Sequence, residues 1–258
     1  MAEIIIKTFE QIQGIRESCM LAAKTLKFIT PYVKEGVTTA YLNDLIEKYI
    51  CDHHAIPAPL NYNGFPKASC ISPNDVVCHG IPSENVMLKS GDILNIDITT
   101  ILNGYYGDTS SMFTIGETSS EALHLIAITK KCLDIGINQC FPGNYFGNIG
   151  FEIGKFAKQN GYGVVYEYCG HGVGLEFHEV PEIQHVADKN SGKKMKPGMI
   201  FTVEPMINQG KARTILDKKD KWTARTIDHK LSAQFEHTVL INSEGCEVLT
   251  DISTSNKL

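Results

Sequence analysis

The spacing of apolar residues predicts four helices. Leu42, Leu45, Ile46, Tyr49 and Ile50 form one stripe, because side chains three and four positions apart share a face of a helix. This helix begins near residue 39 and follows a first helix from about residue 9 to 29. Two more are expected from about residue 120 to before 142, and at 148–159.

Two stretches have the spacing of a capping box, in which two side chains accept hydrogen bonds from each other's free main-chain N–H groups. Thr8 with Gln11 forms the first, and Thr118 with Glu121 forms the second. Helices are therefore expected to begin at both points. Gly161 is expected to end the helix at 148–159, since glycine is common just beyond helix C-termini.

Strands are predicted where short runs of residues with high β-propensity lie between turn signals. The clearest are 92–102 and 105–115, separated by Asn103-Gly104, a two-residue hairpin turn in which both positions need a positive φ. Shorter strands are expected at 68–72, 76–79, 163–168, 199–205 and 234–241.

The hairpin turn determines which residues of its two strands face each other. With Leu102 opposite Tyr105, Thr99 lies opposite Asp108. Asp97 shares the face of Thr99 because strand side chains alternate, so Asp97 and Asp108 are diagonal neighbours. The two isoleucines that flank Asp97 are expected to point the other way, into a core.

The pattern Lys-x-Gly-x-Ile-x-x-(Ile/Val)-acid occurs at 89–97 and again at 196–204, an offset of 107 residues. His-x-(Ile/Val)-Pro occurs at 79–82 and 178–181, and the predicted helix pairs repeat at a similar offset. These echoes predict two pseudo-symmetric halves, at about 8–117 and 118–250, within one domain that spans residues 1–258. The expected class is α+β, with helices outside a central, mostly antiparallel sheet.

Composition excludes several other classes of protein. The 258 residues are 43% hydrophobic and 21% charged, as in an ordinary globular chain. A net charge of -5 provides no electrostatic basis for binding nucleic acid or an anionic membrane. No apolar run approaches the ~20 residues of a transmembrane helix, and no signal peptide is evident. We expect a cytoplasmic protein with free thiols, since its eight cysteines form no CxxC pair.

The two neighbouring aspartates would repel each other on a buried sheet, and divalent cations would remove that repulsion. Glu204 occupies the position in the second repeat that Asp97 has in the first, and Glu236 lies on its return strand. If both hairpins meet, four carboxylates converge, with His171 as a nitrogen donor. Two divalent ions would balance their charge, and Co²⁺, Mn²⁺, Fe²⁺ or Zn²⁺ suits such ligands.

Asp97, Asp108, His171, Glu204 and Glu236, in this order and context, resemble the metal ligands of the type I methionine aminopeptidase family. The stretches 61–67, 77–82, 95–97, 107–109, 170–174 and 203–205 match signature stretches of that family, so the resemblance covers nearly the whole chain. It implies the pita-bread fold, with a curved sheet. It also implies removal of the initiator methionine from peptides and nascent proteins when the second residue is small. The reaction would be attack of a metal-bound hydroxide on the scissile carbonyl.

The resemblance also implies roles for individual residues. One metal ion would be held by Asp108, His171, Glu204 and Glu236, and the other by Asp97, Asp108 and Glu236, with Glu204 also moving the proton of the hydroxide. His79 and His178 would be catalytic residues that contact the substrate. The methionine pocket would be lined by Tyr62, Phe65, Cys70, Phe177 and Trp222, although the family often has tyrosine at the position of Phe65. Main-chain atoms of Asn74, Val76 and Ser232 would bind a monovalent cation.

Two alternatives stay open at this stage. One is a pita-bread aminopeptidase or dipeptidase of proline specificity, which normally has an added N-terminal domain for which 258 residues leave no room. The other is a non-catalytic relative that acts as a binding protein, although such relatives typically lose metal ligands. The expected partner is a peptide that begins with Met, with no specific nucleic acid and no membrane. We expect a monomer, and proximity to the ribosome is a hypothesis that the sequence leaves open.

Overall fold

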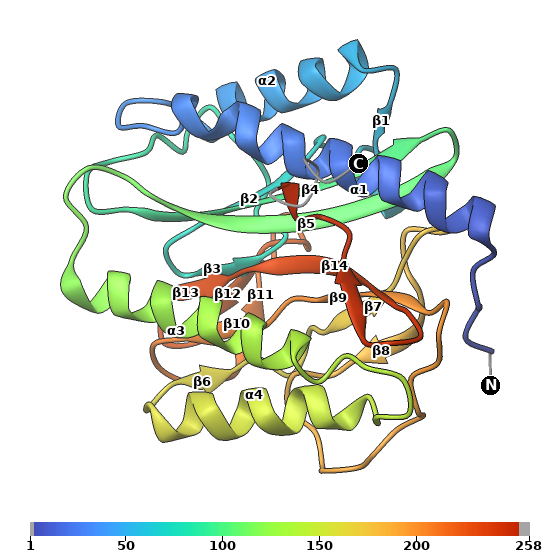
Figure 1. Ribbon diagram of the computed structural model, residues 1–258. Coiled ribbons are helices and arrows are strands. Elements are labelled where there is room, and N and C mark those ends of the chain that lie inside the picture. The colour runs from blue at the N-terminus through green and yellow to red at the C-terminus, as the bar shows by residue number, and fades with distance from the viewer. Residues whose placement is uncertain (1–2, 253–258) are drawn as a thin grey trace.

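The computed structural model describes residues 3–252, in which two pairs of helices flank a set of strands (Figure 1). Helices α1 (Phe9–Ile29) and α2 (Thr39–Asp52) lie beside β4 and β5, and α3 (Ser120–Ile137) and α4 (Gly147–Gln159) lie on the opposite side (Figure 1). Short 3₁₀ helices occupy Thr30–Tyr32 (η1) and Tyr62–Gly64 (η2). All four predicted helices are confirmed.

The helix termini are set by local side-chain bonds. The Thr8 hydroxyl accepts the Gln11 N–H at 3.3 Å, and the Gln11 side chain accepts the Thr8 N–H at 2.9 Å, so the first capping box is confirmed. The second is wrong. Ser119, in extended conformation, is the N-cap and accepts the Ala122 N–H at 3.2 Å. Because the helix begins one residue later than predicted, Glu121 is no longer at the position from which a box can form.

The strands are short apart from one hairpin. They are β1 (Ile56–Pro57), β2 (Cys70–Pro73), β3 (Val76–Cys78), β4 (Ile93–Leu102), β5 (Tyr105–Thr114), β6 (Gly163–Val164), β7 (Gly170–Gly172), β8 (Glu179–Ile183), β9 (Ile200–Val203), β10 (Met206–Asn208), β11 (Thr214–Leu216), β12 (Ala224–Thr226), β13 (Ser232–Gln234), β14 (Glu236–Ile241) and β15 (Cys246–Val248). The predicted strand at 199–205 ends early because Pro205 offers no N–H to a ladder. The predicted strand at 234–241 is divided at Phe235 between two sheets.

The hairpin of β4 and β5 has the predicted register. Leu102 pairs with Tyr105 and Thr99 with Asp108, across a turn in which Asn103 and Gly104 have φ of 52° and 82°. Both isoleucines beside Asp97 are fully buried, in a cluster that includes apolar residues of α1 and α2. One face of this hairpin therefore packs against helices, and the other is free to carry polar groups.

The main sheet has the order β1-β4-β5-β14-β9-β7-β8, and every pairing recorded among residues 3–252 is antiparallel. The pair β9 and β14 lies beside the hairpin of β4 and β5, because β14 pairs with β5. A second core cluster, which includes Phe201, Val203, Leu125 and Ile149, joins this pair to α3 and α4. The α+β class with helices outside the sheet is confirmed, whereas a duplicated origin of the two halves stays a prediction.

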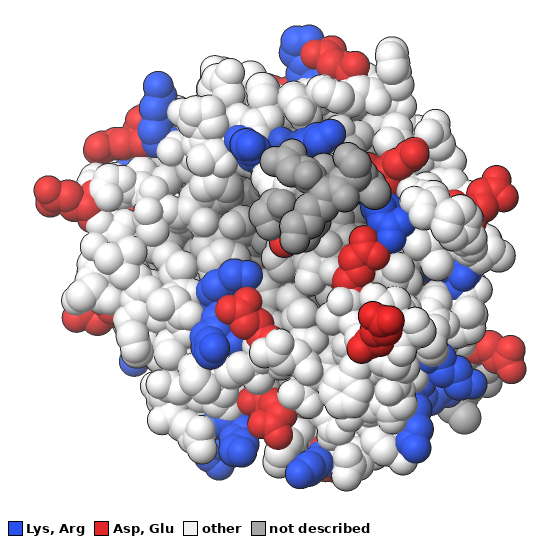
Figure 2. Space-filling view, viewed as in Figure 1, with Lys and Arg blue, Asp and Glu red and all other residues white. Residues whose placement is uncertain are grey.

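The helices and the charged side chains at the surface bear on whether a segment could span a membrane. Among the described residues, no helix is both long and apolar enough to span a bilayer. Figure 2 shows lysine and arginine interspersed with aspartate and glutamate over one face, without an extended patch of one sign.

The cap assignment can be tested with a matched pair of variants. Ser119→Ala removes the acceptor for the Ala122 N–H, so the free energy of unfolding should fall by about 1 kcal/mol. Thr118→Val should leave it unchanged or slightly raised, because the Thr118 hydroxyl is buried without a hydrogen-bond partner among residues 3–252. Urea unfolding of both variants measures the difference. A larger loss for Thr118→Val would restore the predicted box.

Candidate active site

Five neighbouring strands of the main sheet each bring one predicted metal ligand to the same place. In sheet order, β4 carries Asp97, β5 carries Asp108, β14 begins with Glu236, β9 is followed directly by Glu204, and β7 carries His171. The two hairpins therefore meet as the sequence pattern required, with β5 against β14. Residues that are up to 139 positions apart become a single row.

The side chains of this row converge. One ligand atom each from Asp108, His171 and Glu236 lie within 4.8 Å of one another. His171 Nε2 is 3.6 Å from both Asp108 Oδ2 and Glu204 Oε1, too long for hydrogen bonds but close to the spacing of ligands around one cation. Asp97 Oδ1 is buried without a hydrogen-bond partner among the described residues. These acceptors fit divalent cations, which would satisfy the unpartnered oxygen.

Neighbouring groups hold the ligands in orientation. Thr99 donates to Asp108 Oδ1 at 2.8 Å. The Thr202 hydroxyl and the Gln234 amide donate to the two oxygens of Glu204, at 2.7 and 3.1 Å. His171 Nδ1 is 3.0 Å from its neighbour's carbonyl oxygen at Gly172, so this nitrogen carries the proton and Nε2 is free to face the carboxylates.

Thr202, Gln234 and a further neighbour of Glu204, His185, were not predicted from the sequence as site residues. Thr202 lies two positions before Glu204 on one strand, so alternation was a usable signal. His185 Nε2 accepts the main-chain N–H of Glu204 at 3.1 Å, and Gln234 precedes the break between β13 and β14. Neither has a local sequence signal, because each reaches Glu204 only through packing.

Burial determines the protonation of the cluster in the absence of cations. It raises the pKa of Asp108 to about 7 and that of Glu204 to about 8. Burial and the neighbouring carboxylates raise the pKa values of Asp97 and Glu236 well above their usual range. Burial also lowers the pKa of His171 to about 3, so the imidazole is neutral. Without metal, the four carboxyl groups of the folded chain therefore keep their protons to a higher pH than ordinary carboxyl groups do.

A cavity of about 480 Å³ opens above the row, and it contains every predicted substrate-binding residue. Its wall includes Tyr62, Phe65, Cys70, His79, Phe177, His178 and Trp222, together with all five predicted ligands. The rings of Phe65 and Trp222 meet edge to face at 5.3 Å. His178 Nδ1 lies 2.9 Å from the Tyr62 hydroxyl.

The same cavity has walls that the sequence did not predict. Tyr168 meets the ring of His79 edge to face at 5.3 Å, and Met206 and Glu179 also line the space. Tyr168 precedes β7, and Met206 opens β10 just beyond Glu204, so adjacency to the predicted ligands was the available signal.

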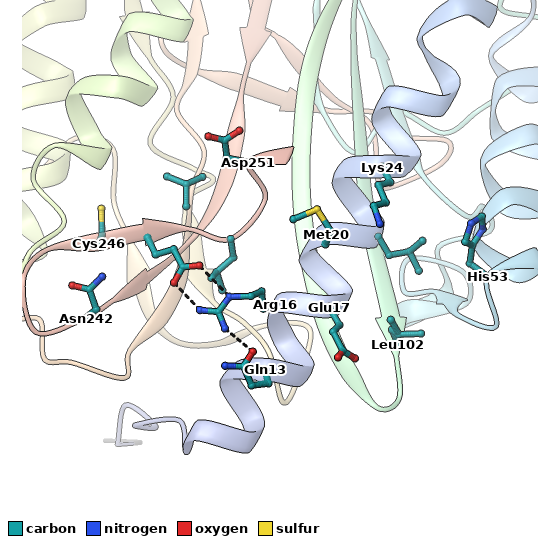
Figure 3. Close-up of a pocket in the computed structure, with 14 residues that line it drawn as sticks. Gln13, Arg16, Glu17, Met20, Lys24, His53, Leu102, Asn242, Cys246 and Asp251 are labelled. Carbon is teal, nitrogen blue, oxygen red and sulfur yellow. Dashed lines mark hydrogen bonds and ion pairs between the residues drawn. The ribbon is translucent and has the colours of Figure 1, made fainter. Parts of the chain in front are cut away.

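A larger cavity of about 1220 Å³ lies elsewhere, between α1 and the segment around β15 (Figure 3). Arg16 crosses it to the Glu247 carboxylate, with bonds of 3.0 and 2.7 Å. No predicted site residue lines it. We therefore assign the chemistry to the smaller cavity, where the buried titratable groups lie.

The residues predicted to hold a monovalent cation also lie together. The Asn74 carbonyl accepts the Ser232 N–H at 2.9 Å, and Val76 begins β3 two positions after Asn74. A cation at this place stays a prediction.

The model of metallopeptidase family M24 matches residues 13–243. The chain belongs to metallopeptidase family M24. Methionine aminopeptidase of Rickettsia prowazekii (strain Madrid E) is 49% identical to this M24 chain over 247 residues, which are 96% of this chain and 95% of that protein. Methionine aminopeptidase of Escherichia coli K12 is 47% identical over 248 residues, 96% of this chain and 94% of that one.

Solved structures agree with this membership. The crystal structure of the R. prowazekii enzyme matches the M24 chain with a TM-score of 0.95 at 48% identity, over 96% of this chain and 100% of that one. The prolidase from Pyrococcus furiosus matches at a TM-score of 0.75 and 24% identity, over 96% of this chain and 65% of that one, which shows the fold alone. The predicted pita-bread fold and the resemblance to methionine aminopeptidases are confirmed. Membership of M24 also implies bound divalent metal ions.

The raised carboxyl pKa values predict how the stability of the metal-free M24 protein depends on pH. Asp108 and Glu204 are ionised in the unfolded chain above about pH 5, but in the folded chain they hold protons up to about pH 7 and 8. The two groups contribute fully to stability at pH values below their pKa values in the unfolded chain. This contribution is lost as the pH rises through their pKa values in the folded chain. Between about pH 7 and 8, where histidines are mostly neutral in both states, the melting temperature should fall.

Thermal unfolding in EDTA at the two pH values measures this fall. Added Mn²⁺ should raise the melting temperature more at pH 8 than at pH 7, because it binds the ionised cluster. Glu204→Gln, which cannot titrate, should flatten the dependence. A metal-free melting temperature that rises over this range would contradict the assignment.

Proposed function

We propose that this chain is a metal-dependent methionine aminopeptidase, which removes the N-terminal methionine from peptides and nascent proteins when the second residue is small. One observation carries the proposal: a row of four carboxylates and one imidazole forms the floor of a cavity with aromatic and apolar walls. The names and near full-length coverage of the relatives at 47% and 49% identity support the same activity.

The row provides ligands for two divalent ions. Asp108, His171, Glu204 and Glu236 would hold one ion, and Asp97, Asp108 and Glu236 would hold the other, so that Asp108 and Glu236 would serve both. Co²⁺, Mn²⁺, Fe²⁺ and Zn²⁺ all suit this set of oxygens with one imidazole. When bound, the two ions lower the pKa of a water molecule and polarise the scissile carbonyl.

We assign to Glu204 the transfer of the proton that the attacking water loses. The two Glu204 oxygens are fixed by the Thr202 hydroxyl and the Gln234 amide, and its main chain by His185. Burial raises the pKa of the Glu204 carboxyl to about 8 in the metal-free chain, and a bound cation would lower this pKa again.

His79 and His178 contact the substrate from the cavity wall. Burial lowers the pKa of both rings, that of His79 to about 4, so each is neutral at neutral pH and can donate one hydrogen bond and accept another. The Tyr62 hydroxyl orients His178. Neutral imidazoles suit the amide and carbonyl groups of a peptide backbone.

The walls of the cavity select the side chain of the substrate's N-terminal methionine. Phe65, Cys70 and Trp222 line the cavity together with Tyr62 and Phe177, and their apolar surfaces suit a flexible thioether. With phenylalanine at position 65, where relatives often have tyrosine, the pocket has one hydroxyl fewer. The exclusion of a large second residue is part of the same proposal, and the peptide assay below tests it.

Two other functions fit less well. The solved prolidases and Xaa-Pro peptidases that this chain resembles are 24% identical or less, so they show the fold and do not support proline-directed activity. A purely binding protein does not need all five ligands, yet here all five converge around one site. We further propose that the chain acts in the cytoplasm as a monomer, near the ribosome, where its nascent substrates appear.

A peptide assay tests this function. With Mn²⁺ or Co²⁺, the protein should release Met from Met-Ala-Ser and Met-Gly peptides, resist Met-Lys and Met-Leu, and leave formyl-Met and Ala-Pro peptides intact. The kcat/KM ratio of Met-Ala to Met-Lys should exceed about a hundredfold if a large second residue is excluded. EDTA should abolish release. Equal kcat/KM for Met-Lys and Met-Ala, or cleavage of Ala-Pro alone, would refute the proposal.

The bridging assignment is tested by two conservative variants. Glu236→Gln removes a charge and a ligand from both ions, so calorimetric titration should show weaker binding at both sites. Asp97→Asn affects one site and should leave the other with near wild-type affinity. Full two-site binding by Glu236→Gln, or loss of both sites in Asp97→Asn, would show that the bridging assignment is wrong.

A further inference from the structure

We propose that Lys7, from the segment before α1, is a positioning residue of the active site. Through a buried ion pair with Glu179 it holds the segment 175–178, which carries Phe177 and His178 into the cavity. This inference rests on the proposed function for the roles of those two side chains. The experiment below separates the failure of one from the failure of the other.

Glu179 is the centre of the arrangement. One of its carboxylate oxygens, Oε1, accepts the main-chain N–H groups of Leu175 and Glu176, at 2.7 and 3.1 Å. The other, Oε2, accepts from the ammonium group of Lys7. A single carboxylate therefore closes the loop from 175 to 179 and ties it to a residue 172 positions away.

Lys7 is itself held in place. Its N–H donates to the Gly198 carbonyl at 2.9 Å, and the Gly198 N–H donates to the Ile241 carbonyl at 2.9 Å, so the N-terminal segment is anchored to the end of β14. The Lys7 side chain is 1% exposed, and that of Glu179 is 5% exposed. An ammonium buried to this degree needs its partner, because an unpaired buried charge is strongly destabilising.

The loop rests directly on Lys7 and α1. A β-carbon at Gly174 would overlap the side chain of Ile15 and lie 3.5 Å from Lys7 Cε. Gly174 also has a φ of 132°, which residues with a β-carbon rarely adopt. The loop can therefore lie close against the helix only with glycine at this position, and the lysine stem forms part of its support.

The other side of the loop meets the reacting groups. The rings of His178 and His171 are 4.3 Å apart, and Phe177 lies 4.7 Å from Tyr62. The loop therefore contacts the buried ion pair on one side and both the predicted metal ligand His171 and the cavity wall at Tyr62 on the other. Movement of its main chain would displace Phe177 and His178 together.

Lys7→Met tests the proposal, since it keeps the length of the stem and removes the charge. With Met-Ala-Ser as substrate, kcat should fall by about tenfold or more, while KM and the metal content stay close to wild type. Arg16→Gln is the matched control, because it breaks an ion pair of α1 that faces the other cavity (Figure 3). That variant should keep kcat within about twofold.

A double variant distinguishes positioning from general stability. Glu179→Gln keeps an acceptor for the two loop N–H groups and removes the charge that Lys7→Met leaves unpaired. The double variant Lys7→Met/Glu179→Gln should therefore recover part of the kcat lost in Lys7→Met, and comparing this recovery with that of the melting temperature separates positioning from general stability. If Lys7→Met does not fold, Glu179→Gln alone should still lower kcat.

Hydrogen exchange gives a readout that does not depend on activity. The amides of Leu175 and Glu176 should exchange faster in Lys7→Met than in wild type or Arg16→Gln, because their acceptor is no longer held. If wild-type protein fails to release Met, the proposed function fails, and exchange still tests the ion pair. Unchanged kcat and unchanged exchange in Lys7→Met would overturn the inference.

Discussion

Repulsion among four buried carboxylates is the constraint around which this structure is arranged. Asp97, Asp108, Glu236 and Glu204 occupy neighbouring strands, in an environment that raises the pKa of each. Such a row is unfavourable unless it is protonated or neutralised by cations. An Asp97 oxygen without a hydrogen-bond partner among residues 3–252 and the His171 Nε2 that faces the carboxylates are available to ligate. Membership of the M24 metallopeptidases agrees with neutralisation of these carboxylates by bound metal ions.

The fold makes this unfavourable row tolerable by separating the two faces of its strands. On one face, the isoleucines of β4 pack against α1 and α2, and residues of β9 and β14 pack against α3 and α4. The acidic groups lie on the other face, at the seam where β5 meets β14. Two hydrophobic clusters thus support one polar site from opposite sides, so a rigid backbone holds the ligands apart at defined distances.

The substrate side of the site is built differently. His79, Phe177, His178 and Trp222 come from turns and loops outside the strands, and only their packing aligns them with the ligands. The loop that carries Phe177 and His178 is closed by the Glu179 carboxylate, which is in turn paired with Lys7. A segment far from the chemistry in sequence is therefore part of the support for the pocket wall.

Local interactions made much of this predictable from sequence. The helix at 9–29, the register that pairs Thr99 with Asp108, and the common face of Asp97 and Asp108 follow from a capping box, a two-residue turn and strand alternation. Each depends on residues a few positions apart. Even so, the structure places the N-cap of α3 at Ser119 and not at the adjacent Thr118. The pairing of β5 with β14, the contact of His185 with Glu204 and the ion pair of Lys7 with Glu179 have no local signal. They join residues far apart in the chain, so burial and packing in the complete tertiary structure decided them.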